Sequence, residues 1–195
     1  MEDVRPFFEY LHKFIPLSWD EFTNDIYPYI TIRSFGKKEL INKAGEVENY
    51  LNFILTGLIR KYYKKGHEEV VTQISVEGQI THAHESFHGR QPSDYYMEAI
   101  EPTTLASITY DDLELIYSRS AKMERLGRLV TIFAMLSRDK WHMDMIKLTP
   151  RERFLKFVER NPDLIQRVPQ KQLASYLNIQ PETFSRFKHL LRRKR

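Results

Sequence analysis

The sequence predicts an α+β protein in which an antiparallel β-sandwich or barrel is followed by a long helix and a pair of short C-terminal helices. Three observations predict this order. Apolar residues alternate with a period of two between Tyr29 and Tyr110, which is typical of half-buried strands. From about Ser120 to Met145 apolar residues recur at helical spacing without a proline. Residues 170–195 contain two short helical patterns separated by a turn.

The composition fits a folded chain without cysteine chemistry. Of the 195 residues, 42% are hydrophobic and 13% are aromatic, as in globular proteins, and none is cysteine. Disulfides, iron–sulfur clusters and cysteine-ligated zinc or haem are therefore excluded. The sequence has no signal-peptide pattern and no apolar run of about 18 residues, so we expect a cytoplasmic protein that does not enter a membrane.

The segment before the predicted strands is expected to form two short helices. Apolar residues recur at helical spacing within residues 3–28. Ser18 and Glu21 have the spacing of a capping box, which places the start of the second helix, and Pro28 lies near its end. The strands that follow are separated by turn residues, namely Gly57, Lys64–His67, Glu77-Gly78 and Glu101-Pro102.

The long helix is predicted to carry a seam for a second copy of the chain. Four apolar residues trace a stripe close to seven-residue spacing, and either Leu136 or Ser137, followed by Trp141, extends it. A long helix with such a stripe favours a parallel homodimer, and packing on the chain's own barrel is the alternative. The predicted dimer residues are Met123, Leu126, Val130 and Phe133.

A further helix is marked by its ends. Thr149, Pro150 and Glu152 supply an N-cap, a first-turn proline and a capping-box acid, and Asn161-Pro162 ends the helix. We therefore place a domain boundary near Lys147.

Residues 170–195 carry the strongest functional pattern. Leu173, Ala174 and Leu177 form the apolar face of a first short helix, and Asn178 suits a left-handed turn. Pro181 suits the first position of the second helix. The buried stripe expected on that second helix consists of Phe184, Phe187, Leu190 and Leu191.

The opposite face of this second helix is polar, and its end is basic. Six of the ten residues 186–195 are Lys or Arg, although the net charge of the whole chain is only +4. Such a concentration of positive charge favours binding to DNA phosphates, and a purely structural hairpin is the alternative. The predicted DNA-contacting residues are Gln170, Gln180, Glu182, Thr183, Ser185, Arg186 and Lys188.

In the order of its parts the chain resembles the cyclic-AMP receptor protein/FNR family of bacterial transcription regulators. The resemblance is carried by the segments beginning at Phe53, Glu77 and Tyr96 and most specifically by VPQKQLASYLNIQPETFSRFKHLL at residues 168–191. It implies a jelly-roll barrel of cyclic-nucleotide-binding type over residues 1–118. It also implies a dimerisation helix over 119–146 and a helix-turn-helix domain over 147–195.

The same resemblance implies a regulator rather than an enzyme. Its implied partners are double-stranded DNA, a second copy of the chain and RNA polymerase. Because the sequence ends directly after the second short helix, we expect no DNA contacts from the C-terminal wing hairpin that other family members have.

The sequence departs from this family where cyclic nucleotides are bound. Members that bind them use a Glu for the ribose hydroxyl and an Arg for the phosphate, and these positions fall on Ala83 and Ser93. Losing a charge-assisted contact of this kind costs about 2–5 kcal/mol, so we do not expect cyclic AMP as effector and assign no cofactor. The predicted pocket, for another small molecule or none, comprises Ala83, Arg90, Ser93 and Asp94.

Three histidines give the competing hypothesis. On a strand, His82 and His84 would share one face, as the metal ligands of cupin enzymes do, with His88 nearby. Glu85 directly follows His84 and would face away, and no second cupin motif follows. We therefore expect a solvent-exposed loop without metal, and a cupin-like metal-dependent enzyme or metal sensor is the alternative.

Overall fold

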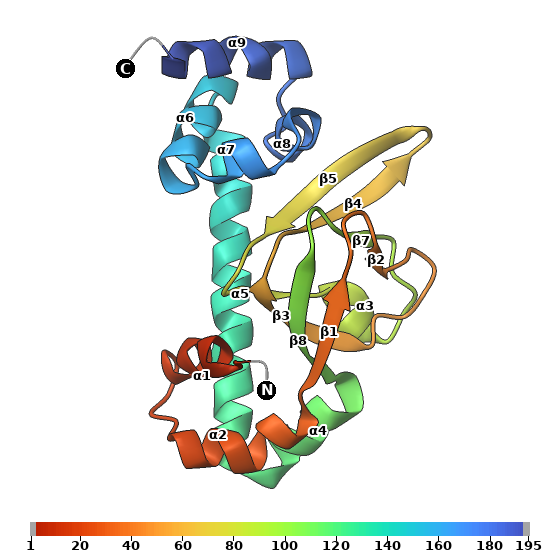
Figure 1. Cartoon of the computed structure of the whole chain (residues 1–195), viewed down its shortest axis with the longest axis vertical. Coiled ribbons are helices and arrows are strands. Elements are labelled where there is room, and N and C mark those ends of the chain that lie inside the picture. The colour runs from red at the N-terminus through yellow and green to blue at the C-terminus, as the bar shows by residue number, and fades with distance from the viewer. Residues whose placement is uncertain (1–2, 193–195) are drawn as a thin grey trace.

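The computed structural model describes residues 3–192, and within α9 it describes side chains only as far as His189. The side chains of Leu190 and Leu191 and the basic residues 193–195 therefore lie outside the described residues. A β-barrel flanks a long helix, α5, whose far end carries the C-terminal helices (Figure 1). The N-terminal helices lie near the opposite end of α5 (Figure 1). The predicted α+β class is confirmed.

Two short helices and one 3₁₀ turn precede the barrel: α1 (Arg5–His12), α2 (Trp19–Asp25) and η1 (Tyr27–Tyr29). The predicted capping box is present, since the Glu21 N–H donates to Ser18 Oγ at 3.2 Å and the Ser18 N–H donates to Glu21 Oε2 at 2.8 Å. Phe7 of α1 stacks on Phe53 of the barrel with ring centroids 4.7 Å apart. The N-terminal helices therefore complete the core at one end of the barrel.

The barrel consists of two four-stranded sheets whose neighbouring strands run antiparallel. The first sheet has the order β1-β8-β3-β6 and the second β2-β7-β4-β5. The turns predicted at Gly57, Gly66 and Gly78 are confirmed, and all three glycines have positive φ. The strands are β1 (Thr31–Phe35), β2 (Leu40–Asn42), β3 (Tyr50–Thr56), β4 (Ile59–Lys65), β5 (Glu68–Ser75), β6 (Ile80–Thr81), β7 (Tyr96–Ala99) and β8 (Thr103–Thr109).

Three helices adjoin the strands: α3 (His84–Gly89) between β6 and β7, then α4 (Tyr110–Arg119) and α5 (Ala121–Lys147). Ser120 caps α5 by accepting from the Met123 N–H at 3.2 Å. A Cβ at Gly127 of α5 would come within 2.3 Å of the Tyr117 ring, so this glycine permits the close approach of α4 and α5.

The C-terminal part contains α6 (Pro150–Arg160), α7 (Leu164–Arg167), α8 (Gln170–Tyr176) and α9 (Pro181–Arg192). The capping box predicted at Thr149 is confirmed, with the Glu152 N–H donating to Thr149 Oγ1 at 3.3 Å and Glu152 Oε2 accepting from the Thr149 N–H at 2.8 Å. None of the described helices is long and apolar enough to span a membrane.

Candidate nucleic-acid interface and sensor site

The turn between α8 and α9 has the geometry that the sequence predicts. Asn178 adopts a left-handed conformation with φ of 51°, and the Ile179 N–H donates to the Ala174 carbonyl at 2.9 Å. That bond satisfies a carbonyl left open at the end of α8. Leu173, Ala174 and Leu177 are fully buried, so α8 and α9 are fixed relative to each other by packing as well as by the turn.

Arg153 of α6 holds this turn, and sequence analysis missed it. The side chain is buried and donates to the carbonyls of Leu177 at 2.9 Å, Asn178 at 2.9 Å and Leu148 at 2.8 Å. These carbonyls lie at the ends of α8 and α5, where the helix dipoles favour a positive charge. Because its partners are backbone carbonyls, and those of Leu177 and Asn178 lie 24 and 25 residues away, no local pattern of side chains marks Arg153.

Helix α9 is anchored by aromatic residues and presents a polar face. Phe184 is 1% exposed and meets the Phe154 ring edge-on at 5.1 Å, and Phe187 also packs on Phe154. On the other face Arg186 is exposed and donates to Thr183 Oγ1 at 3.2 Å. Among the other predicted DNA-contacting residues, Gln180 and Glu182 are exposed, whereas Gln170, Thr183, Ser185 and Lys188 are half-buried.

Helix α8 packs against β5 of the barrel. The Val71 N–H of β5 donates to Ser175 Oγ of α8 at 2.9 Å. Tyr176 of α8 stacks on Trp141 of α5 with ring centroids 4.4 Å apart. Trp141, which we expected to extend the dimer stripe, therefore packs within its own chain.

Arg167 of α7 adds a polar link between the C-terminal helices and the barrel. Its Nη2 lies 2.5 Å from a carboxylate oxygen of Glu77 and 2.5 Å from one of Glu101. Burial alone would raise the pKa of Glu77, but the hydrogen bonds from Arg167 lower it below its ordinary value. Both parts of the chain are therefore joined by packing and by charge.

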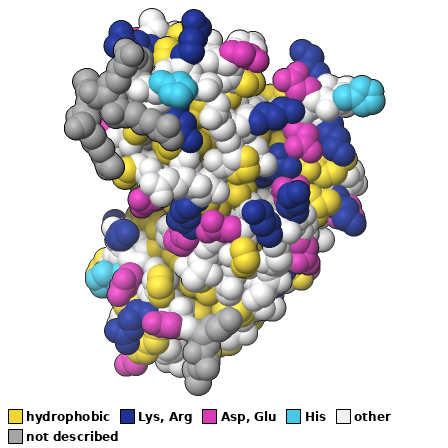
Figure 2. Space-filling view, turned by 45° about the horizontal axis from the view of Figure 1, so that its top comes forward, with side chains coloured by type: hydrophobic (Ala, Val, Ile, Leu, Met, Phe, Trp, Pro, Cys, Tyr) yellow, Lys and Arg dark blue, Asp and Glu magenta, His cyan; other side chains and the backbone are white. Residues whose placement is uncertain are grey.

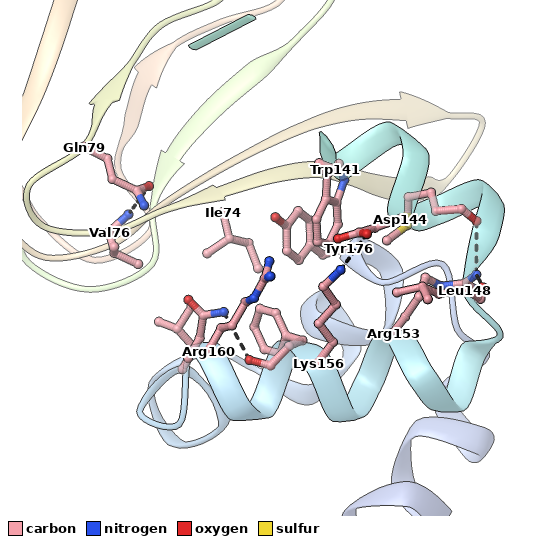
Figure 3. Close-up of a pocket in the computed structure, with 14 residues that line it drawn as sticks. Ile74, Val76, Gln79, Trp141, Asp144, Leu148, Arg153, Lys156, Arg160 and Tyr176 are labelled. Atoms are coloured by element: carbon pink, nitrogen blue, oxygen red, sulfur yellow. Dashed lines mark hydrogen bonds and ion pairs between the residues drawn. The ribbon is translucent and has the colours of Figure 1, made fainter. Parts of the chain in front are cut away.

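A cavity of about 160 Å³ lies at this junction (Figure 3). Its lining includes Ile74 of β5, Trp141 and Asp144 of α5, Lys156 of α6 and Tyr176 of α8. The Lys156 ammonium forms an ion pair with Asp144 at 2.6 Å, drawn as a dashed line in Figure 3. Because Lys156 and Asp144 neutralise each other, neither residue is available as an unpaired charge for a ligand in the cavity.

The exposed apolar stripe of α5 differs from the predicted dimer seam. Met123 and Leu126 are 2% and 5% exposed and belong to the chain's own core, and Val130 packs against that core. Phe133 is 52% exposed and contacts Phe14 of the N-terminal segment. The large apolar residues of α5 that are exposed are Ile132, Phe133, Met135, Leu136 and Ile146.

The prediction that Met123 and Leu126 face a second copy is therefore wrong for this structure. Ile132 and Leu136 are four residues apart, and Met143 and Ile146 continue the same phase seven and ten residues after Leu136. This phase lies one position before the predicted stripe at 130 and 133. One position is a rotation of about 100° around a helix. Near the start of α5, the side chains of the predicted stripe are buried in the chain's own core. Further along the helix, the side chains one position earlier are exposed to solvent.

The predicted effector residues are used within the chain. Arg90, which we expected at an effector pocket, donates to the Glu48 carbonyl at 2.9 Å and to Asn49 Oδ1 at 2.6 Å. Its guanidinium also lies 4.3 Å from the centroid of the Tyr110 ring. Arg90 therefore fastens α3 to the segment before β3.

The residues at the two missing anchor positions are buried, and neither bears a charge. Ala83 is 2% exposed in the barrel core, and Ser93 is 4% exposed with its hydroxyl 3.1 Å from the Tyr95 carbonyl. Asp94 is exposed, and as an anion it would repel a phosphate.

The histidine segment is not the exposed loop that we predicted. His82 is 3% exposed, His84 is half-buried and only His88 is exposed. The strand β6 ends at Thr81 and α3 begins at His84, so the extended backbone assumed for the cupin comparison is absent from this segment. On a helix, residues four apart share a face, which brings His84 and His88 together.

Burial sets the charge state of these histidines. Desolvation lowers the pKa of His84 to about 3 and that of His82 well below its ordinary value, and the positive charges of Lys61 and Arg138 lower both further. Burial also lowers the pKa of His88, which Glu114 partly opposes. All three imidazoles are therefore neutral at pH 7. Burial lowers the pKa of Lys61 itself to about 8.

Comparison with known proteins places the barrel in a family of domains. Residues 32–120 match the family model of the cyclic nucleotide-binding domain. No curated protein matches the chain in sequence.

Solved structures of regulators share the fold over most of the chain. FixK2 from Bradyrhizobium japonicum is 22% identical, with a TM-score of 0.67 and 85% of each chain covered. The c-di-GMP-responsive global regulator CLP from Xanthomonas campestris is 15% identical, with a TM-score of 0.64 over 88% of this chain and 91% of CLP. The catabolite activator protein of Thermus thermophilus is 16% identical, with a TM-score of 0.58 over 95% of this chain and 87% of that protein.

Proposed function

We propose that this chain, which resembles the cyclic-AMP receptor protein/FNR family of bacterial transcription regulators, binds double-stranded DNA as a homodimer and regulates transcription. It acts by binding and not by catalysis, in the cytoplasm, with RNA polymerase as a further partner. The barrel over residues 1–118 is the sensor part, residues 119–146 form the dimerisation helix, and residues 147–195 form the helix-turn-helix domain.

The observation that carries this proposal is the two-sided character of α9. One side is fixed by Phe184 against Phe154, and the other presents Glu182, Thr183 and Arg186. An α-helix with short polar and basic side chains on its free face fits the major groove, where an arginine can pair with a guanine edge. The left-handed turn at Asn178 and the buried Arg153 keep α9 in one orientation.

The exposed stripe of α5 supports the homodimer. Leu136 and Ile146 are 59% and 64% exposed, although they are large and apolar. Two copies of this helix that pack along the stripe would remove those side chains from water and place two α9 helices about a two-fold axis. A dimer of this kind binds inverted half-sites about one helical turn of DNA apart.

The charge pattern outside α9 suits a local DNA interface. Acidic and basic side chains are mixed across the face shown in Figure 2, so the surface there is not uniformly positive. We therefore assign the attraction to phosphate to the concentration of six Lys and Arg residues at 186–195.

A gel-shift experiment with genomic fragments tests the proposal. The wild-type chain should shift a subset of fragments in the presence of unrelated competitor DNA, and the Arg186→Ala/Lys188→Ala variant should lose that selectivity. Lys13→Ala/Lys37→Ala is the matched control, because it also removes two positive charges, from exposed positions far along the chain from α9. Binding by the double variant that equals wild type would contradict the proposed interface.

A further inference from the structure

Three histidine rings meet beside the barrel. His82 follows β6, and His84 and His88 lie in the first and last turns of α3. One imidazole nitrogen from each ring can be chosen so that all three lie within 4.8 Å of one another. His82 Nε2 and His88 Nε2 are 3.3 Å apart.

The spacing of two of these residues is that of a metal-binding helix. Residues 84–88 read His-Glu-Ser-Phe-His, so two histidines stand four positions apart on one helical face. Zinc-binding helices hold two imidazoles at this spacing, because the side chains of residues i and i+4 converge. Spacing alone is weak support, but here a third ring from outside the helix completes the cluster.

We propose that His82, His84 and His88 form a site for one divalent transition-metal ion, with Zn²⁺ as the best fit. Zinc–nitrogen bonds of about 2.0–2.1 Å in a tetrahedron place two ligand nitrogens about 3.3–3.4 Å apart. The separation of 3.3 Å between His82 and His88 fits this geometry. Three protein ligands leave the fourth tetrahedral position open to water or another small ligand.

The burial of His82 supports a preformed site. This side chain is 3% exposed, and its Nδ1 is buried without a hydrogen-bond partner among the described residues. This Nδ1 is not the nitrogen that faces His88, so coordination through Nε2 would leave it unpaired, and the support for a preformed site is the burial of the ring beside the other two. The rings are also tightly grouped, with the centroids of His82 and His84 4.0 Å apart.

Nearby charged side chains affect the affinity of the three histidines for a metal ion in opposite directions. Lys61 and Arg138 repel positive charge at His82 and His84, whereas Glu114 attracts it at His88. We therefore expect binding weaker than in a three-histidine site without neighbouring cations. The site does not depend on the proposed DNA binding, so each can be tested without the other.

The test uses the untagged full chain after treatment with a chelator and removal of that chelator. Zn²⁺ is titrated in competition with a chromophoric chelator, and Co²⁺ is added in parallel as a spectroscopic substitute. Wild type should take up one Zn²⁺ per chain, melt at a higher temperature with the ion, and give the intense visible bands of tetrahedral Co²⁺.

Variants distinguish this site from adventitious binding. His84→Ala and His88→Ala should each weaken binding by more than the roughly 10–100-fold that removing a hydrogen-bond partner of a metal ligand costs. His67→Ala is the control, because it removes an exposed histidine from the β4–β5 turn and should leave the affinity unchanged. His88 is exposed, so its variant should fold, and circular dichroism verifies this. The proposal fails if folded wild type takes up no stoichiometric Zn²⁺, or if both α3 variants retain wild-type affinity.

Discussion

The two halves of α5 lie in different surroundings. Near its start, Met123 and Leu126 are buried in the core of the chain's own barrel. Beyond Val130, Leu136 is 59% exposed and Ile146 is 64% exposed. The folding of one chain explains the first half and the packing of Trp141 on Tyr176, but it does not explain the exposed apolar side chains of the second half.

This difference separates residues that stabilise the fold from residues that are free to assemble copies of the chain. Burying a leucine side chain contributes about 1.5–3 kcal/mol. In the first half, burial of the side chains stabilises the folded chain. In the second half, the same burial can occur only when another surface covers the stripe, and it would then stabilise that assembly. Substitutions in the two halves should therefore affect different measurements.

The largest expected effect is that of Leu136→Asp on the dimer. In a two-fold dimer each change occurs twice, so two leucine side chains are removed from the interface and two carboxylates enter it. We expect the dimer dissociation constant to rise by on the order of a hundredfold or more, measured by sedimentation, with an unchanged melting temperature for the monomer.

Thr131→Asp is the matched control for that change. It adds the same charge at an exposed position of the same helix outside the stripe, and it should leave the dimer intact. Phe133→Asp should act in the same direction as Leu136→Asp, but Phe133 also contacts Phe14 and some folding stability should disappear with it. A Leu136→Asp chain that still sediments as a dimer would rule out the stripe.

Leu126→Ala tests the buried half. Removing this side chain leaves a cavity in the barrel core and should lower the free energy of unfolding by about 2–5 kcal/mol. Chemical denaturation measures this decrease, and sedimentation of the folded fraction should still show dimers. Loss of the dimer without a decrease in the free energy of unfolding would mean that Leu126 contacts the second copy, as the sequence predicts.

Arg186→Ala should have a smaller effect that is confined to DNA. If Arg186 pairs with a guanine, the change should cost about 1–3 kcal/mol of binding free energy and relax the preference at one base pair of each half-site. Binding measured on a set of single-base operator variants separates this from a uniform decrease. An unchanged affinity for the preferred operator would show that α9 is oriented differently.

Lys188→Ala should have the smallest effect on specificity. A lysine that contacts phosphate contributes equally on every sequence, so all fragments should weaken alike. The slope of log affinity against log salt should become shallower by about 0.9 for each phosphate that the protein no longer neutralises. A change in base preference would indicate that Lys188 contacts a base edge instead.

The barrel should not respond to cyclic AMP. Its two anchor positions hold Ala83 and Ser93, both buried, and the Arg90 guanidinium is hydrogen-bonded to the Glu48 carbonyl. Calorimetry with cyclic AMP and cyclic GMP at millimolar concentration should show no saturable heat. Micromolar binding would mean that Arg90 or another cation can leave its partners and hold the phosphate.

Features set by local chemistry could be predicted from the sequence. The capping boxes at Ser18 and Thr149 and the left-handed turn at Asn178 each depend on a few neighbouring residues. The buried side of α9 followed from helical spacing alone, as far as Phe184 and Phe187 are described.

Features set by packing could not be predicted in this way. A core stripe and a dimer stripe have the same period on a helix, so spacing did not show which phase of α5 the barrel covers. The prediction for the histidines is wrong because it places the segment on a strand or in a loop, whereas α3 begins at His84 and turns His88 toward it. Arg153 binds carbonyls that are distant in the sequence and leaves no local pattern.

Selection of DNA from a random library tests the central claim most directly, because it examines binding, specificity and symmetry together. The wild-type chain should enrich sites with two inverted half-sites about 10 base pairs apart from centre to centre, and each duplex should bind two chains. Leu136→Asp should enrich no such two-fold sites at the same concentration. Enrichment of no sequence, or of a single asymmetric site bound by one chain, would contradict the account.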